Sequence, residues 1–276
     1  MGEYLINRLG FEKQVHEPDW SEWQRLIEET ETRFEHEITI ALVGKYVILQ
    51  DAYLSVKEAL FHAARHNKIR LSIKWIDAEL VTDETAPALF HGCDGILVPG
   101  GFGDRAIEGK IVAAKWARTH KIPYLGLCLG MQVLCIELAR AFIKSTAHSM
   151  ECDETTDTPI VALMDAQKNV TKKGGTMRLG IYHCKLLPGS KAAFAYETQE
   201  IVNERHRHRF EFNNLYRSAL QDAGLIISGE SPDGGLVEIV ELKDHPFMVA
   251  SQFHPEFLSR PQKPHPLFDA FIAATL

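Results

Sequence analysis

The 276-residue chain contains 45% hydrophobic and 24% charged residues, a composition typical of globular proteins that bury a full core. Its 30 basic and 37 acidic residues give a formal net charge of -7, which argues against nucleic acid as a partner. No apolar run approaches about 18 residues and no signal-peptide pattern opens the chain. We therefore expect a cytoplasmic protein with no membrane partner.

The cysteines indicate free thiols. There are five of them, with no CxxC pair: Cys93, Cys128, Cys135, Cys152 and Cys184. An odd count without paired spacing fits neither a disulfide framework nor a structural zinc site, so we expect no metal. Cys135 lies within an apolar helical run and is interpreted as a packing residue.

The N-terminal residues 1–37 are predicted to form a linker or arm. Four apolar residues recur there at helical spacing: Trp20, Trp23, Leu26 and Ile27. Their face can pack on the same domain or connect to another one, and the sequence leaves both readings open. Residues 38–276 are predicted to form the main domain.

The main domain alternates strand and helix patterns. Strands are predicted over 38–43, 71–76, 95–98 and 123–127, and helices over 52–64, 107–119 and 131–142. This alternation predicts an α/β fold with a mainly parallel central sheet flanked by helices on both faces. Further short strands are predicted over 160–164, 225–228, 236–240 and 247–251, followed by a helix over 267–274. We expect some of these strands to be antiparallel additions.

The segment Gly126-Leu127-Cys128-Leu129-Gly130 has the form of a nucleophile elbow. It lies where an apolar strand ends and a helix begins, and a turn this tight requires small residues on both sides. The helix N-terminus favours the thiolate of the central cysteine. Cys128 is therefore the predicted nucleophile.

A cysteine nucleophile needs a base and a group that orients the base. Gln252-Phe253-His254-Pro255-Glu256 follows a predicted strand, and the i, i+2 spacing places an imidazole and a carboxylate on one side of an extended chain. We predict His254 as general base and then acid, with Glu256 fixing its tautomer. The glycine-rich segment after the 95–98 strand predicts an oxyanion hole made by the N–H groups of Gly101 and Leu129.

In this order, the elbow, the glycine-rich loop and the terminal His-Pro-Glu resemble class-I glutamine amidotransferases and, among them, the glutaminase domains of CTP synthases. The segments that carry the resemblance are INRLGF (6–11), EPDWSEW (17–23), GKYVILQDAYLSV (44–56), DGILVPGGFGDRAIEGK (94–110), GLCLGMQ (126–132), GGTMRLG (174–180), RHRHRFEFNN (205–214) and QFHPEF (252–257). The resemblance implies hydrolysis of L-glutamine. It also implies a set of glutamine-binding residues: Gly101, Leu129, Gly130, Met131, Gln132, Glu151 and Arg209.

The resemblance further implies that ammonia passes to an amidoligase domain, which is expected to be absent from this chain. That domain uses ATP, Mg and UTP to make CTP, and GTP activates the glutaminase half. No cofactor is expected on this chain itself. The whole enzyme is expected to be a homotetramer and this piece a monomer, either excised or free-standing. Two alternatives stay open: a free-standing glutaminase or γ-glutamyl hydrolase-like enzyme, and a non-catalytic module that senses glutamine or a nucleotide.

Overall fold

The computed structural model describes residues 2–11, 19–31, 34, 36–163 and 177–276. Two of the segments that carry the resemblance, 17–23 and 174–180, extend outside these ranges. The chain divides into two compact units, Met1–Arg33 and Phe34–Leu276. The division falls four residues before the predicted boundary, because strand β1 already begins at His36.

The first unit contains two helices, α1 (Gly2–Leu9) and α2 (Ser21–Glu31). The predicted arm helix corresponds to α2, which carries Trp23 and Ile27. Just before it, the carboxylate of Asp19 accepts a hydrogen bond of 2.9 Å from the Ser21 N–H. A side-chain acceptor at this place satisfies one of the free N–H groups with which every helix begins.

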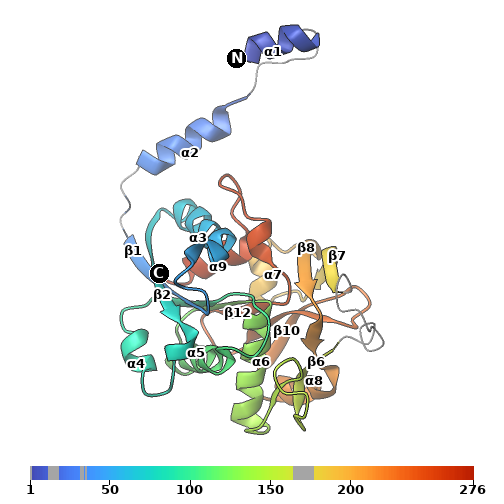
Figure 1. The fold of residues 1–276 in the computed structure, drawn as a ribbon. Coiled ribbons are helices and arrows are strands. Elements are labelled where there is room, and N and C mark those ends of the chain that lie inside the picture. Colours follow the sequence, from blue (N-terminus) through green and yellow to red (C-terminus); the bar gives the residue numbers. More distant parts are fainter. Residues whose placement is uncertain (1, 12–18, 32–33, 35, 164–176) are drawn as a thin grey trace. The chain divides into compact units, whose positions relative to one another are not determined.

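The second unit is built on a nine-stranded sheet (Figure 1), in the order β2-β1-β3-β4-β12-β11-β10-β7-β8. The strands are β1 (His36–Gly44), β2 (Ile69–Asp77), β3 (Gly95–Val98), β4 (Tyr124–Leu127), β7 (Arg178–Leu186), β8 (Ile201–His208), β10 (Leu225–Glu230), β11 (Val237–Leu242) and β12 (Met248–Ser251). The five strands from β2 to β12 are parallel, and the four that follow pair antiparallel. A small second sheet has the order β5-β6-β9.

Helices and short strands complete the unit. The helices are α3 (Leu54–His66), α4 (Ala86–Leu89), α5 (Ile107–His120), α6 (Leu129–Phe142), α7 (Lys191–Ala195), α8 (Arg217–Asp222) and α9 (Pro266–Ala273). Short 3-10 turns span Gln50–Tyr53, Ala78–Leu80, Asn214–Tyr216 and Pro255–Phe257. The second sheet consists of β5 (His148–Ser149), β6 (Pro159–Leu163) and β9 (Phe210–Phe212).

Two apolar cores lie on opposite faces of the large sheet. Successive side chains of a strand point to opposite faces, so Ala41 and Val43 join the core beneath α5 and α6. Ile40 and Leu42 join the core beneath α3 and α9 instead. Because both faces are covered, the central parallel strands β3, β4 and β12 are continuous apolar runs in the sequence.

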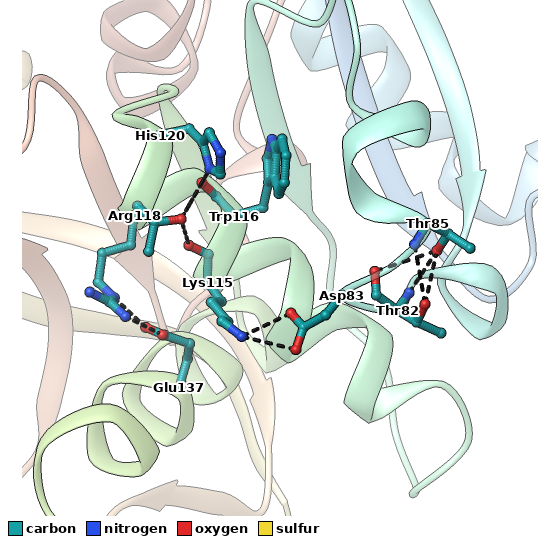
Figure 2. A network of polar contacts seen from close by, with 9 residues as sticks. Thr82, Asp83, Thr85, Lys115, Trp116, Arg118, His120 and Glu137 are labelled. Atoms are coloured by element: carbon teal, nitrogen blue, oxygen red, sulfur yellow. Dashed lines mark hydrogen bonds and ion pairs between the residues drawn. The ribbon is translucent and has the colours of Figure 1, made fainter.

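Helices α5 and α6 are joined by a two-pronged ion pair (Figure 2). The Arg118 guanidinium donates to both oxygens of Glu137, at 2.8 and 2.7 Å. The carboxylate is buried, and two parallel charge-assisted hydrogen bonds fix its orientation. Since α6 begins directly after Cys128, this contact helps to hold the helix that starts at the predicted nucleophile.

The predicted fold class is confirmed, with several local differences. The antiparallel part is larger than expected, because β7 and β8 form a long hairpin that the apolar pattern did not indicate. The helix expected over 52–64 is divided between a 3-10 turn and α3, and α6 begins two residues earlier than expected. The strand expected over 160–164 corresponds to β6, and residue 164 lies outside the described ranges.

Candidate active site

Three neighbouring parallel strands bring the predicted catalytic segments together. β3 leads into the glycine-rich loop, β4 into the elbow, and β12 into the segment that contains His254. Ser251 lies opposite Leu127 in the β12–β4 register, and the Cys128 N–H donates to the Ser251 carbonyl at 2.7 Å. The carboxyl ends of parallel strands share one edge of the sheet, which is where α/β proteins place their sites.

The elbow holds Cys128 in a backbone conformation that few side chains adopt. Its φ is 51° and its ψ is -98°, at the point where β4 ends and α6 begins. A side chain at Gly130 would have its Cβ 2.2 Å from the Val98 carbonyl oxygen, and one at Gly126 would lie 2.7 Å from the Gly130 backbone. Both flanking glycines are therefore needed for close approach of the backbones.

His254 and Glu256 form the predicted pair. The Nδ1 atom of His254 lies 2.8 Å from Glu256 Oε1, and both side chains are buried. The pair is made across the Pro255–Phe257 turn rather than along the extended chain that the spacing suggested. His254 Nε2 is buried and has no hydrogen-bond partner within the described ranges, so it is the ring nitrogen left to exchange a proton with a reacting group.

The charge state of His254 follows from its neighbours. Burial lowers the pKa of His254, but the Cys128 sulfur and the Glu256 carboxylate outweigh that effect and raise the pKa from 6.5 to about 11. A raised histidine pKa means that the folded protein favours the imidazolium. An imidazolium beside a cysteine sulfur is a common means of activating a cysteine nucleophile.

The Glu256→Gln variant removes the carboxylate charge and keeps the shape of the side chain. We expect the His254 pKa to fall, the imidazolium–thiolate pair to be depleted, and glutamine hydrolysis near pH 7 to drop by about 10² to 10⁴-fold. Because the imidazolium is lost on the alkaline side, the alkaline limb of the rate–pH profile should also move to lower pH. Steady-state ammonia release across pH measures both effects. Glu58→Gln, on the exposed face of α3, is the matched control. An unchanged profile in Glu256→Gln would contradict the assigned role.

The glycine-rich loop packs directly against the imidazole and the elbow. A Cβ at Gly100 would lie 2.8 Å from His254 Cε1 and 3.6 Å from the Cβ of Cys128. A Cβ at Gly101 would lie 3.4 Å from the Leu129 side chain, so the two residues predicted for the oxyanion hole are neighbours. Leu129 opens α6, and its N–H is one of the helix donors that have no acceptor within the helix.

A buried cation lies behind this loop. Lys110, in the first turns of α5, is fully buried, and its Nζ would lie 3.5 Å from a Cβ at Gly101. Within the described ranges this ammonium has no hydrogen-bond partner. Burial, followed by the positive charges of Lys45 and Arg105, lowers the pKa of Lys110 to about 8. Positive charge at this place favours an anion on the side of the loop where the oxyanion is predicted.

One of the residues expected to recognise glutamine contacts the glycine-rich loop. Glu151 accepts a hydrogen bond of 2.8 Å from the Gly103 N–H, which ties its carboxylate to the glycine-rich loop. Arg209 is half-buried in the turn between β8 and β9. The Met131 side chain belongs to the apolar core, and the Gly130 carbonyl accepts a hydrogen bond of 2.9 Å from the Tyr124 hydroxyl.

Sequence reasoning missed one contact with the nucleophile. The Gln252 side-chain amide donates to Cys128 Sγ at 3.6 Å, and its oxygen accepts from Gln132 Nε2 at 3.3 Å. The i, i+2 relation between Gln252 and His254 at the end of a strand was the signal that could have indicated it.

Comparisons with known proteins identify the family. The model of the family described as glutamine amidotransferase class-I matches residues 48–274. The chain belongs to the class-I glutamine amidotransferase family.

Within this family, its similarity is to CTP synthases. It is 56% identical over 276 residues to the CTP synthase of Caldanaerobacter subterraneus subsp. tengcongensis, covering 99% of this chain and 50% of that protein. The CTP synthase of Roseiflexus castenholzii is 55% identical, with 99% and 49% covered. The chain thus spans about half the length of the curated relatives it matches, and the resemblance expected from the sequence is confirmed.

Two solved structures are similar to this chain. The glutaminase domain of Trypanosoma brucei CTPS, solved with bound acivicin, has a TM-score of 0.81 and 41% sequence identity, covering 86% of this chain and 93% of that one. A putative GMP synthase protein from Thermoplasma acidophilum has a TM-score of 0.55 at 16% identity, covering 87% of this chain and 95% of that one, and supports the fold alone.

Two kinds of feature are absent from the described residues. No group of three or more His, Cys, Asp or Glu side chains there is arranged to hold a metal ion. No helix in the same part of the chain is both long and apolar enough to cross a membrane.

Proposed function

We propose that the chain hydrolyses L-glutamine to glutamate and ammonia through a γ-glutamyl thioester on Cys128. The observation that carries this proposal is the arrangement of His254. Its Nδ1 is held by Glu256 at 2.8 Å, its buried Nε2 has no partner among the described residues, and Cys128 is one of the groups that raise its pKa.

In the resting site, Cys128 has already given its proton to His254 Nε2, so the reaction starts from a thiolate and an imidazolium. The sulfur then attacks the side-chain amide carbon of glutamine. The N–H groups of Gly101 and Leu129 donate hydrogen bonds that stabilise the negative charge on the amide oxygen. His254 returns the proton to the amide nitrogen as the C–N bond breaks. Ammonia leaves, and the acyl group remains on sulfur as a thioester.

In the second half, water attacks the thioester carbon and gives a proton to His254 Nε2. The same N–H groups stabilise the second oxyanion. The C–S bond breaks, glutamate leaves, and the thiolate and imidazolium of the resting enzyme are restored. Glu256 stays ionised throughout and stabilises the imidazolium at each step.

Glutamine recognition is assigned to Arg209 for the α-carboxylate and to Glu151 for the α-ammonium, since each offers the complementary charge. The backbone of Gly101 and of residues 129–132 completes the proposed pocket.

The Arg209→Ala variant should raise the KM for glutamine by about 10 to 100-fold and change kcat much less, because a carboxylate contact away from the reacting amide is made equally in the ground and transition states. Steady-state kinetics measures both constants. Arg70→Ala, on the exposed face of β2, is the matched control. An unchanged KM in Arg209→Ala would remove this assignment.

The proposal extends to the longer relatives. The ammonia is proposed to reach a CTP synthase amidoligase domain, which uses ATP and Mg to aminate UTP to CTP in the cytoplasm, with GTP as an activator of the glutaminase half. The complete enzyme is proposed to be a homotetramer.

The direct test of the glutaminase activity is release of ¹⁵N-ammonia from glutamine labelled at its side-chain amide, with asparagine and a γ-glutamyl peptide as comparison substrates. Release from glutamine alone supports the proposal. Preference for the peptide would instead indicate a γ-glutamyl hydrolase, and no turnover of any substrate in folded protein would indicate a non-catalytic module.

A further inference from the structure

A side-chain amide, distinct from the proposed catalytic pair, contacts the nucleophilic sulfur. Gln252 follows β12 directly, and its side chain is fully buried. Its Nε2 donates to Cys128 Sγ at 3.6 Å, a normal length for a hydrogen bond to sulfur. Its backbone N–H donates to the Glu238 carbonyl at 2.8 Å, so the residue is fixed at both ends.

The direction of this amide is set by a second glutamine. Gln132 Nε2 lies 3.3 Å from Gln252 Oε1 and 3.1 Å from the Phe210 carbonyl, and both of those atoms can only accept. Gln132 therefore presents its donor end to Gln252. With its oxygen used in this way, Gln252 must turn its N–H₂ group to the sulfur.

Two buried histidines continue the chain of hydrogen bonds away from the site. His208 Nδ1 lies 3.3 Å from the Phe210 carbonyl, and His208 Nε2 lies 3.0 Å from His206 Nδ1. Burial, followed by the positive charge of Arg178, lowers the pKa of His206 to about 2 and that of His208 to about 3, so both rings are neutral. Each Nδ1 then carries a proton, and the Phe210 carbonyl accepts both from His208 Nδ1 on one side and from Gln132 Nε2 on the other.

We propose that Gln252 is a second catalytic donor, whose amide N–H stabilises the Cys128 thiolate before attack and again when the sulfur leaves the thioester, with Gln132 as its positioning residue. The inference rests on the proposed glutamine hydrolysis for its place in the reaction. The hydrogen bond moves no proton and no electrons. It stabilises the anionic sulfur, whereas His254 exchanges a proton with it.

The test uses iodoacetamide, a small electrophile that needs no glutamine site. The thiolate displaces iodide, and peptide mass spectrometry follows the S-alkylation of Cys128 as a function of pH. In Gln252→Met, which keeps the volume and removes the donor, the midpoint of the rate–pH profile should rise by about one pH unit. The matched control, Gln221→Met on the exposed face of α8, should leave the midpoint unchanged.

Because alkylation requires no glutamine, this result is independent of whether the wild-type chain hydrolyses glutamine. An unchanged midpoint in folded Gln252→Met would overturn the inference while leaving the proposed function intact. A merely structural role for Gln252 would lower stability without moving the midpoint.

A second measurement decides the matter if Gln252→Met does not fold. In the wild-type protein, the side-chain amide proton resonance of Gln252 should shift downfield by NMR as the Cys128 thiolate forms with rising pH. The shift should be lost in Cys128→Ser, whose hydroxyl does not ionise in this range. A Gln252 resonance that is indifferent to pH in the wild-type protein would overturn the inference.

Discussion

The Cys128→Ala variant should release no measurable ammonia from glutamine, a loss of at least about 10⁴-fold, while remaining folded. The sulfur is the only atom proposed to bond to the substrate, and removing one member of a nucleophile–base pair removes nearly all the catalysis that the pair provides. Circular dichroism checks the fold, and the ¹⁵N-ammonia assay measures the loss.

Cys135→Ala is the matched control for this change. Cys135 lies within α6, is fully buried, and has its pKa raised to about 12 by burial, so its thiol is inert. We expect its replacement to cost about 1 kcal/mol of stability through lost packing and to leave glutamine turnover unchanged. Retained turnover in Cys128→Ala, or loss of turnover in Cys135→Ala, would show that Cys128 is not the nucleophile.

The second large effect is expected from Gly130→Ala. The new methyl group would lie 2.2 Å from the Val98 carbonyl oxygen, and because that oxygen belongs to the backbone of β3, it cannot move aside cheaply. We expect a loss of about 3 kcal/mol in the free energy of unfolding, together with displacement of Cys128 from the end of β4. Urea unfolding measures the first effect.

Gly101→Ala provides the stability control, since its methyl group would approach only flexible side chains, with the nearest atom 3.4 Å away. Its midpoint in urea should stay close to that of the wild-type protein. Equal midpoints for Gly130→Ala and Gly101→Ala would mean that the elbow tolerates a side chain, and that the close approach to Val98 is not required.

Much of the parallel part of the fold was predictable because its central strands β3, β4 and β12 are apolar and buried, while the edge strand β2 alternates apolar and polar residues. Burial on both faces produces such runs, and the glycines that follow β3 and flank Cys128 mark where the strands end. Cys128, His254 and the glycine-rich loop each follow a predicted strand, and they lie together because the carboxyl ends of parallel strands share one edge of the sheet.

The β7–β8 hairpin could not be found in this way. Every second residue of β8 is buried, but most of these inward residues are polar: Glu204, His206 and His208. Their partners come from other parts of the chain. Glu204 Oε1 lies 3.0 Å from His265 Nε2. On β7, Arg178 Nη1 lies 2.6 Å from Glu238 Oε1. Because the buried face of β8 is mostly polar, the sequence shows no alternation of apolar and polar residues there. The segment therefore resembles an exposed charged stretch rather than a strand.

The Gln252 contact was missed for a related reason. Its meaning depends on which end of the amide faces the sulfur, and that is set by Gln132, which is 120 residues away in the sequence. Sequence spacing predicts which side of a strand a residue lies on. It does not predict the direction of a hydrogen bond fixed by a distant residue.

The central claim is that Cys128 is a nucleophile in a site that recognises glutamine. Labelling with 6-diazo-5-oxonorleucine, a glutamine-like electrophile, followed by peptide mapping by mass spectrometry, tests it most directly because one covalent event suffices. We predict a single adduct on Cys128 that excess glutamine suppresses and asparagine does not. Labelling spread over several cysteines, or labelling of Cys128 that glutamine does not suppress, would contradict the account.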